Sequence, residues 1–317
     1  MTDVAGPGPD VSVVMPTYNS AGYVRAAVQS CLAQTLDCWE LIVVDDGSSD
    51  DTVSIVETMQ DPRILVVAQG ENRGPGAARN VGLAHCRGRW VTFLDSDDTF
   101  DPRRLEVLRS ASLELGDSTV VFDRLVRTAE QPEQNLSAGI SEWGSVTDLI
   151  LFHDIDGFVR RYIPMQPFVS TRLIVESHAM FPEEGRIGED LAFVVQLLSA
   201  HGARLAEVRL PLYWHRRRQD SLSKMSADDA LQNYRPTLEF LWHVPAVRNR
   251  FGHIIAEKQD RMYASYAANA ALERLTSGRL IDAYRLLSNH PDARPMFRRR
   301  FRAAAAFRWR KLRGQDT

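Results

Sequence analysis

Residues 90–98 read WVTFLDSDD, a short apolar run that ends in three acids within four positions. Aromatic and β-branched residues favour extended backbone, so residues 90–94 are predicted to form a buried strand. Three carboxylates at the end of a buried strand repel one another unless a cation lies beside them. Mg²⁺ and Mn²⁺ suit such a cluster, because they bind one or two carboxylates together with substrate phosphates. A metal site is therefore predicted at residues 95–98.

The sequence on the N-terminal side of this segment repeats the same alternation. Apolar residues at helical spacing predict helices over 21–34 and 75–84. Three more short apolar runs predict strands, at 11–15, 41–44 and 64–68. Strands that alternate with helices and are apolar throughout predict an α/β fold, with a mostly parallel sheet covered by helices on both faces. Ligands bind such sheets at the carboxyl ends of the strands, where the polar clusters of this chain lie.

The predicted organisation is one large domain followed by a smaller helical region. A flexible N-terminus covers 1–10, and the α/β domain covers 11–223, closing with a helix at 189–200 and a strand at 203–208. Beyond it, 224–317 shows helical patterns only. Arg261–Thr276 and Arg279–Ser288 predict a helical hairpin with Gly278 at its turn.

Charge and composition exclude some classes of protein. The net charge of −3 and the pI near 6.3 argue against a nucleic-acid binder. Residues 298–313 hold eight Lys or Arg and no acid, and removing these eight charges from the net −3 leaves −11 on the rest. Three cysteines without metal spacing suit reduced core positions in a cytoplasmic protein. No signal peptide and no membrane-spanning apolar run are evident in the sequence.

Polar residues follow the first two predicted strands. In Pro16-Thr-Tyr-Asn19, Tyr18 could stack on a planar base while Thr17 binds the edge of that base. In Asp45-Asp-Gly-Ser48, one carboxylate could accept a hydrogen bond from a base N–H or a ribose hydroxyl. Ordinary turns explain both segments as well, because Asp and Ser readily cap the following helix.

The segment from Asn72 to Asn80 suits an anion. Gly74 and Gly76 let backbone amides approach a phosphate, and the following helix presents its positive end there. Arg79, one turn into that helix, adds a bidentate donor. The alternative is a glycine-rich loop beside an ordinary surface arginine.

Two further polar segments lie later in the chain. Glu189 and Asp190 open a predicted helix, where acids often serve only as partners of the helix dipole. His215 begins the run His-Arg-Arg-Arg218, with Ser221 close behind, although an isolated histidine is more often structural.

Taken in this order, the motifs resemble the family 2 inverting glycosyltransferases with the GT-A fold, over about residues 11–223. The resemblance lies in VSVVMPTYN (11–19), DDGS (45–48), Gly74 with ARN (78–80), FLDSDD (93–98) and GED (188–190). It implies a metal-dependent enzyme that moves a sugar from a nucleotide-diphospho-sugar to an acceptor hydroxyl, and it favours uridine as the base of the donor. Carbohydrate or glycolipid acceptors would place it in the synthesis of polysaccharide, wall polymer or glycoconjugate.

The resemblance also implies roles for individual residues. Asp190 would be the catalytic base, with Glu189 beside it. Donor-binding residues would be Pro16, Thr17, Tyr18, Asn19, Asp45, Asp46, Gly74, Arg79, Asn80, Asp95, Ser96, Arg218 and Ser221. Metal ligands would be Asp95, Asp97, Asp98 and His215.

Departures from the family pattern narrow the expected activity. The chain lacks the Gln-x-x-Arg-Trp signature of processive synthases, which favours a single addition over polymerisation. A sugar-phosphate nucleotidyltransferase is an alternative, but it would carry a Gly-rich basic loop after the first strand, and Pro16–Asn19 is not one. A non-catalytic carbohydrate-binding protein is a second alternative, and the full set of acids argues against it.

The C-terminal segment, about 294–313, predicts a basic amphipathic helix. Its apolar stripe comprises Phe297, Phe301, Ala305, Trp309 and Leu312. Such a helix could bring a cytoplasmic enzyme to the anionic inner face of a membrane. Alternatively, the stripe packs on the helical hairpin or on a second copy of the chain in a homo-oligomer.

Overall fold

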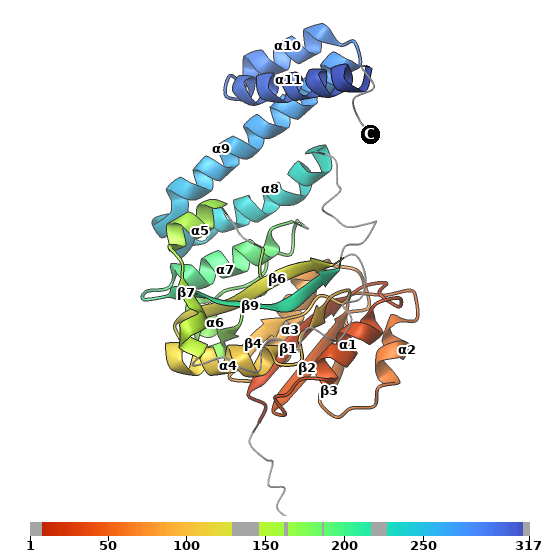
Figure 1. The fold of residues 1–317 in the computed structure, drawn as a ribbon, viewed down its shortest axis with the longest axis vertical. Helices are drawn as coiled ribbons and strands as arrows, with labels where there is room; N and C mark the ends of the chain where they lie inside the picture. The colour runs from red at the N-terminus through yellow and green to blue at the C-terminus, as the bar shows by residue number, and fades with distance from the viewer. Residues whose placement is uncertain (1–7, 129–145, 162–163, 186, 217–226, 313–317) are drawn as a thin grey trace, which may run out of the picture.

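The computed structural model describes residues 8–128, 146–161, 164–185, 187–216 and 227–312 (Figure 1). An α/β body contains most of the chain, and the end of the chain, from the second half of the long helix α9 (Pro245–Thr276) onward, extends away from it (Figure 1). None of the helices in this described part combines the length and hydropathy that a bilayer crossing requires.

The main sheet has the strand order β3-β2-β1-β4-β8, in which the first four strands are parallel and β8 runs antiparallel to β4. These strands are β1 (Val11–Thr17), β2 (Trp39–Asp45), β3 (Ile64–Ala68), β4 (Trp90–Phe93) and β8 (Val169–Ser170). The predicted α/β class with a mostly parallel sheet is confirmed. Since β1, β2 and β3 end side by side, the polar clusters that follow them meet at one edge.

Pro16 lies inside β1, although the sequence predicts that the strand stops before it. The Val14 carbonyl accepts a hydrogen bond from the Leu94 backbone N–H, just after β4. The backbone hydrogen-bonding groups of every second β1 residue, counted from Val14, therefore point toward β4. The backbone nitrogen of Pro16 therefore points toward β4, but at a level beyond Phe93, where β4 has already ended. Its missing N–H removes no ladder hydrogen bond, and the strand continues to Thr17.

Helices cover both faces of the main sheet. Val11, Val13 and Met15 point to the face covered by three helices, α1 (Val24–Leu32), α2 (Thr52–Glu57) and α4 (Arg104–Leu115). Val14 points to the opposite face, covered by α3 (Pro75–His85) and α7 (Glu189–Ser199). A Cβ atom at Gly82 of α3 would lie 2.3 Å from Val14 Cγ1, so glycine permits the close approach of helix and strand.

A second sheet, β5-β9-β6, adjoins the first, with β7 paired to β9. Its strands are β5 (Thr99–Phe100), β6 (Thr119–Thr128), β7 (Ile150–Phe152) and β9 (Arg204–Arg216). The sequence predicts shorter strands here, at 119–122 and 203–208, with a further strand-like run at 210–214 after an interruption. Pairing of β6 with β9 shifts register between Asp123 and Leu125, which lets both strands continue past the interruption. Short helical segments lie between these strands, at η2 (Val146–Leu149), α5 (Ile155–Arg161) and α6 (Thr171–Ser177).

The described part of the chain after β9 consists of the helices α8 (Ala227–His243), α9 (Pro245–Thr276), α10 (Leu280–Asn289) and α11 (Ala293–Leu312). The predicted hairpin turn is confirmed, since Gly278 stands between α9 and α10 at φ +80°. Helix α9 begins at Pro245 rather than Arg261, and its first half joins the body, where Phe251, Ile254 and Ile255 are buried with α7. Helices α8 and α9 thus belong to the same apolar core as α7 and the main sheet.

Candidate active site

Arg79 of α3 joins three of the predicted motifs. Its guanidinium lies 2.7 Å from Asp95 Oδ1, at the end of β4, and 3.1 Å from Glu189 Oε1, at the start of α7. The arginine side chain is only 6% exposed, so these contacts form in a largely dry environment. The acidic segments at 95–98 and 188–190, far apart in sequence, therefore lie on either side of one buried cation.

The charges around Arg79 stabilise one another. Burial opposes the charged form of Arg79, but Asp95, Glu189 and Asp190 outweigh it and raise its pKa above the usual value. Burial raises the pKa of Glu189, and Arg79 partly counteracts that rise. A fixed positive charge beside these acids stabilises the pre-assembled cluster before any ligand binds.

Asp95 is held from its other side as well. Gln166 Nε2 donates to Asp95 Oδ2 over 3.1 Å, and the Asp95 backbone N–H donates to the Tyr213 hydroxyl over 3.2 Å. The Gln166 carbonyl in turn accepts from Arg104, which is fully buried and paired with Asp123. This carboxylate is thus fixed in position by residues that no sequence motif marks.

Asp98 is the most enclosed acid of the 95–98 cluster. Its oxygens accept hydrogen bonds from the Tyr213 hydroxyl at 2.7 Å and the Arg216 backbone N–H at 2.8 Å, and His215 Nδ1 lies at 3.2 Å. Burial raises the pKa of Asp98 to about 6, with His215 opposing the rise. The hydrogen bond with Asp98 raises the pKa of His215. Asp98 and His215, both predicted as metal ligands, therefore contact each other and tie the cluster to β9; their role as ligands stays a prediction.

Unpartnered polar atoms line up at the ends of β1, β2 and β3. Among the described side chains, Thr17 Oγ1, Asp45 Oδ1 and both amide atoms of Gln69 are buried without a hydrogen-bond partner. Thr17 pairs with Asp45 in the sheet, and the Gln69 backbone N–H donates to the Asp45 carbonyl over 2.9 Å. Buried polar groups without partners are costly, so this row is suited to a polar ligand.

Asp46 organises the loop that leads into α3. Its two carboxylate oxygens accept from the backbone N–H groups of Arg73, at 2.7 Å, and Gly74, at 2.8 Å. Gly74 has φ +92°, a left-handed conformation that favours glycine. Asp46 is thus already engaged in holding the loop, whereas its neighbour Asp45 keeps an oxygen without a partner.

Several other predicted donor-binding residues serve to hold loops together. Asn19 accepts from Ser49 through Oδ1, and Ser96 shares a 2.8 Å hydrogen bond with Ser20. Asn80 exchanges two hydrogen bonds with the backbone of Phe181, so its amide faces that loop. Tyr18 is 48% exposed at the same edge and remains available to a ligand. Arg218 and Ser221 lie outside the described residues.

The turn that carries Asp190 rests against α8. Thr237 donates to the Ile187 carbonyl over 2.8 Å, and a Cβ atom at Gly188 would lie 2.5 Å from Tyr234 Cε2. Burial and then Asp190 raise the pKa of Tyr234 to about 12, which reflects how close the two side chains are. Helix α8 therefore sets the position of the segment that holds the predicted base.

A family comparison agrees with this arrangement. Residues 12–165 match the family model described as Glycosyl transferase family 2. The chain carries a family 2 glycosyltransferase domain. The matched segment includes the sheet edge, Arg79 and the acids at 95–98.

Curated relatives extend the similarity beyond that segment. The succinoglycan biosynthesis protein ExoO of Rhizobium meliloti (strain 1021) is 33% identical over 225 residues, which cover 68% of this chain and 63% of that protein. The chain spans between 40% and 63% of the length of the first curated relatives it matches.

Solved structures share the fold. TarS 1-349 of S. aureus in complex with UDP-GlcNAc superposes with a TM-score of 0.63 at 23% identity, covering 86% of this chain and 79% of that one. The mannosyltransferase PcManGT of Pyrobaculum calidifontis, in complex with GDP-Man and Mn²⁺, gives a TM-score of 0.57 at 20% identity, covering 95% and 81%. The predicted GT-A fold of the family 2 enzymes is thereby confirmed.

The acids at 95–98 suit a divalent cation that takes only one or two of its ligands from the protein. The part of the chain that the structure describes has no group of three or more His, Cys, Asp or Glu side chains arranged to hold a metal. Mg²⁺ and Mn²⁺ in phosphate-transfer sites commonly take only one or two carboxylates and complete their shell with phosphate and water. Asp95 and Asp97 can supply two hard oxygen donors, so the residues fit a cation that the donor diphosphate shares.

Replacing Thr237 tests how α8 supports this site. Thr237→Val removes the hydrogen bond to Ile187 and should cost about 1 kcal/mol of unfolding free energy. Because the Gly188–Asp190 turn loses its support, turnover should fall while the affinity for donor nucleotide stays unchanged. Thr237→Ser keeps the hydroxyl and should restore turnover. Equal loss of turnover in the Ser and Val variants would show that the hydrogen bond does not position the turn.

Proposed function

We propose that the chain catalyses inverting transfer of a sugar from a nucleotide-diphospho-sugar, with uridine as the base, to an acceptor hydroxyl. The observation that carries the proposal is the row of unpartnered atoms of Thr17, Asp45 and Gln69 beside the carboxylate cluster. A planar polar base would hydrogen bond to this row, and the adjoining acids would bind the phosphates through a cation. A nucleoside diphosphate contains both a base and phosphates.

Uracil suits the row chemically. Its N–H can donate to the free Asp45 oxygen, and its carbonyl oxygens can accept from the Thr17 hydroxyl or the Gln69 amide. Tyr18, half exposed at the same edge, can stack on the ring. The TarS structure named above contains UDP-GlcNAc, which supports a uridine donor, whereas PcManGT contains GDP-Man.

Asp95 and Asp97 are proposed to bind Mn²⁺ or Mg²⁺. The contacts of Asp98 with Tyr213 and His215 would keep the segment 95–98 in position. When bound, the cation would neutralise negative charge that develops on the leaving diphosphate. Arg79 keeps Asp95 fixed between its guanidinium and Gln166, so the carboxylate is positioned in advance. The Mn²⁺ in the PcManGT structure supports a divalent cation.

Asp190 is proposed as the base. It would accept the proton of the acceptor hydroxyl as the hydroxyl oxygen attacks the anomeric carbon and the bond to the diphosphate breaks. Attack opposite to the leaving group inverts the anomeric centre. Glu189 is paired with the buried Arg79, and we therefore assign it to support of the cluster and Asp190 to the proton transfer.

The acceptor is proposed to be a saccharide of a cell-surface polysaccharide, a wall polymer or a glycolipid. ExoO is named for succinoglycan biosynthesis, which supports a polysaccharide precursor. The acceptor is proposed to approach from the side of Asp190, because the proposed base must reach the acceptor hydroxyl.

Titration calorimetry of the full chain with UDP and GDP, with and without Mn²⁺, tests the donor. We expect UDP to bind more tightly than GDP and Mn²⁺ to strengthen binding. Transfer from UDP-sugars to a saccharide acceptor, with inversion observed by NMR, completes the test. Release of pyrophosphate from UTP and a sugar 1-phosphate would instead identify a nucleotidyltransferase.

Tyr18→Ala should weaken UDP binding by about tenfold, because stacking on a base contributes about 1–3 kcal/mol. The thermal midpoint should not change, since Tyr18 is 48% exposed. Tyr284→Ala is the matched control, because Tyr284 is 74% exposed on α10 and far from the sheet edge (Figure 1). Equal UDP affinity of the Tyr18 and Tyr284 variants would exclude stacking on Tyr18.

A further inference from the structure

Helix α11 has an inner face that packs on α9. Ala293, Met296 and Phe297 contact the small residues of α9 in one apolar cluster. Arg300 also faces inward, where it hydrogen bonds to the Ser265 carbonyl and hydroxyl and to Asn269. The beginning of the predicted apolar stripe is therefore used for packing on the hairpin. Phe301, the next member of the stripe, is 45% exposed.

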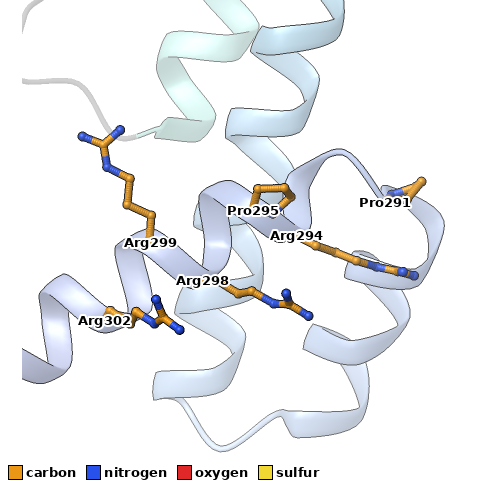
Figure 2. Close-up of a pocket in the computed structure, with 6 residues that line it drawn as sticks. All are labelled: Pro291, Arg294, Pro295, Arg298, Arg299 and Arg302. Carbon is orange, nitrogen blue, oxygen red and sulfur yellow. The ribbon is translucent and has the colours of Figure 1, made fainter.

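The outer face of α11 carries a ladder of arginines. Arg294, Arg298 and Arg302 follow one another at four-residue spacing, and Figure 2 shows their side chains extending in the same direction. With Pro291, Pro295 and Arg299 they line a groove of about 620 Å³. The groove is wide enough for a group as large as a lipid phosphate headgroup.

These arginines have no acidic partner in the ion pairs of the described residues. Some exposed arginines of other helices do pair with acids four positions away, as in Arg235–Glu239 and Arg261–Glu257. No such pair involves Arg298, Arg299 or Arg302, and the sequence has no acid between 293 and 312. Arg294 bonds to the Leu287 carbonyl. The ladder thus presents positive charge that no ion pair of the described residues neutralises, while the net charge of the sequence outside 298–313 is negative.

Exposed apolar side chains accompany this charge. Leu280, Ile281 and Tyr284 of α10 are 61%, 70% and 74% exposed, and the last two are the most exposed large apolar residues in the described part of the chain. Helices α10 and α11 lie together at the end of the molecule away from the sheet (Figure 1). The arginines of the ladder and these exposed apolar side chains therefore occur in one helical unit.

We propose that the α10–α11 surface is a docking site for an anionic lipid bilayer. Phosphates and carboxylates of lipid headgroups would pair with the ladder, and the apolar side chains of α10 would enter the interfacial layer. The apolar component favours lipid over a nucleic acid or a soluble phosphate polymer, which would leave Leu280, Ile281 and Tyr284 in water. Docking through this end leaves the sheet edge open to solvent and to its donor.

Co-sedimentation of the full chain with vesicles tests the proposal, using phosphatidylcholine with and without phosphatidylserine. We expect binding to the phosphatidylserine vesicles that weakens as salt rises. The variant R294Q/R298Q/R302Q should lose about a hundredfold in affinity, because each arginine near an anionic surface contributes about 1 kcal/mol. The variant I281S/Y284S should bind more weakly at high salt, where the apolar contribution dominates.

R172Q/R235Q/R261Q is the matched control, because it changes the net charge equally through exposed arginines outside the ladder. It should retain most of the vesicle affinity, and circular dichroism should show that all variants keep the native helix content. Neither donor nor metal is added, so the result is independent of transferase activity. Absence of vesicle binding at low salt, an equal loss in the control, or binding to short RNA or polyphosphate without binding to vesicles would overturn the proposal.

Discussion

Asp190→Asn should lower kcat by about 10³-fold while the affinity for UDP and Mn²⁺ stays within about twofold of the parent, since a positioned base contributes about 10²–10⁴-fold. The amide cannot accept the proton of the acceptor hydroxyl, but it occupies the same volume at the start of α7. Arg79 keeps its contacts with Asp95 and Glu189, so the donor side of the site is preserved. Single-turnover kinetics with the protein in excess over the donor measures the chemical step.

Glu189→Gln provides the comparison for Asp190. It weakens the charge pair with the buried Arg79, so we expect a lower thermal midpoint and a smaller loss of turnover than in Asp190→Asn. If Asp190→Asn instead abolishes donor binding and retains high turnover, Asp190 belongs to the donor site. Glu189 would then be the candidate base.

Asp97→Asn should abolish the gain in UDP affinity on adding Mn²⁺ and should lower turnover by about 10³-fold, because charge stabilisation by a cation contributes several kcal/mol. The fold should be retained, since the change removes a negative charge from a crowded acidic cluster. Calorimetry with and without Mn²⁺ is the measurement. Asp95→Asn should show the same loss of Mn²⁺ dependence, although its contact with Arg79 makes a loss of stability larger there.

Asp98→Asn separates binding of the metal from support of the loop. Its carboxylate accepts from Tyr213 and Arg216, so replacing it should lower the thermal midpoint while Mn²⁺ still strengthens UDP binding. Unchanged Mn²⁺ dependence in both Asp95→Asn and Asp97→Asn would refute the metal site. Loss of that dependence in Asp98→Asn would show that Asp98 is itself a ligand.

Local patterns predict the first hundred residues well, because each strand is a short apolar run and each helix has one apolar face. They also predict that the polar clusters meet, since parallel strands end at a common edge. They do not show which acid of the 95–98 cluster turns inward. That is decided by Tyr213 and His215, more than a hundred residues later in the chain.

Contacts between distant segments explain most of what the sequence does not reveal about the site. Gln166 and Gln69 belong to no sequence motif. Gln166 nevertheless donates a hydrogen bond to Asp95, and Gln69 adds two atoms to the row of unpartnered polar atoms. Arg79 is predicted to face the nucleotide because it follows a glycine-rich loop. In the structure its guanidinium lies between two carboxylates, so contact with the nucleotide remains a prediction.

The packing of α8 on the Gly188–Asp190 turn determines where this chain can be joined to another one. A chimera joined at residue 223 would give the Gly188 turn a foreign helix in place of Tyr234 and Thr237. Glycine at 188 has φ +78° and almost no free space beside it, so a different helix would displace the predicted base. A junction at Ser277–Gly278, between α9 and α10, leaves that packing intact. If the proposals above hold, exchange of α10 and α11 there should change the membrane affinity of the chain while the proposed transfer reaction keeps its donor and its stereochemistry.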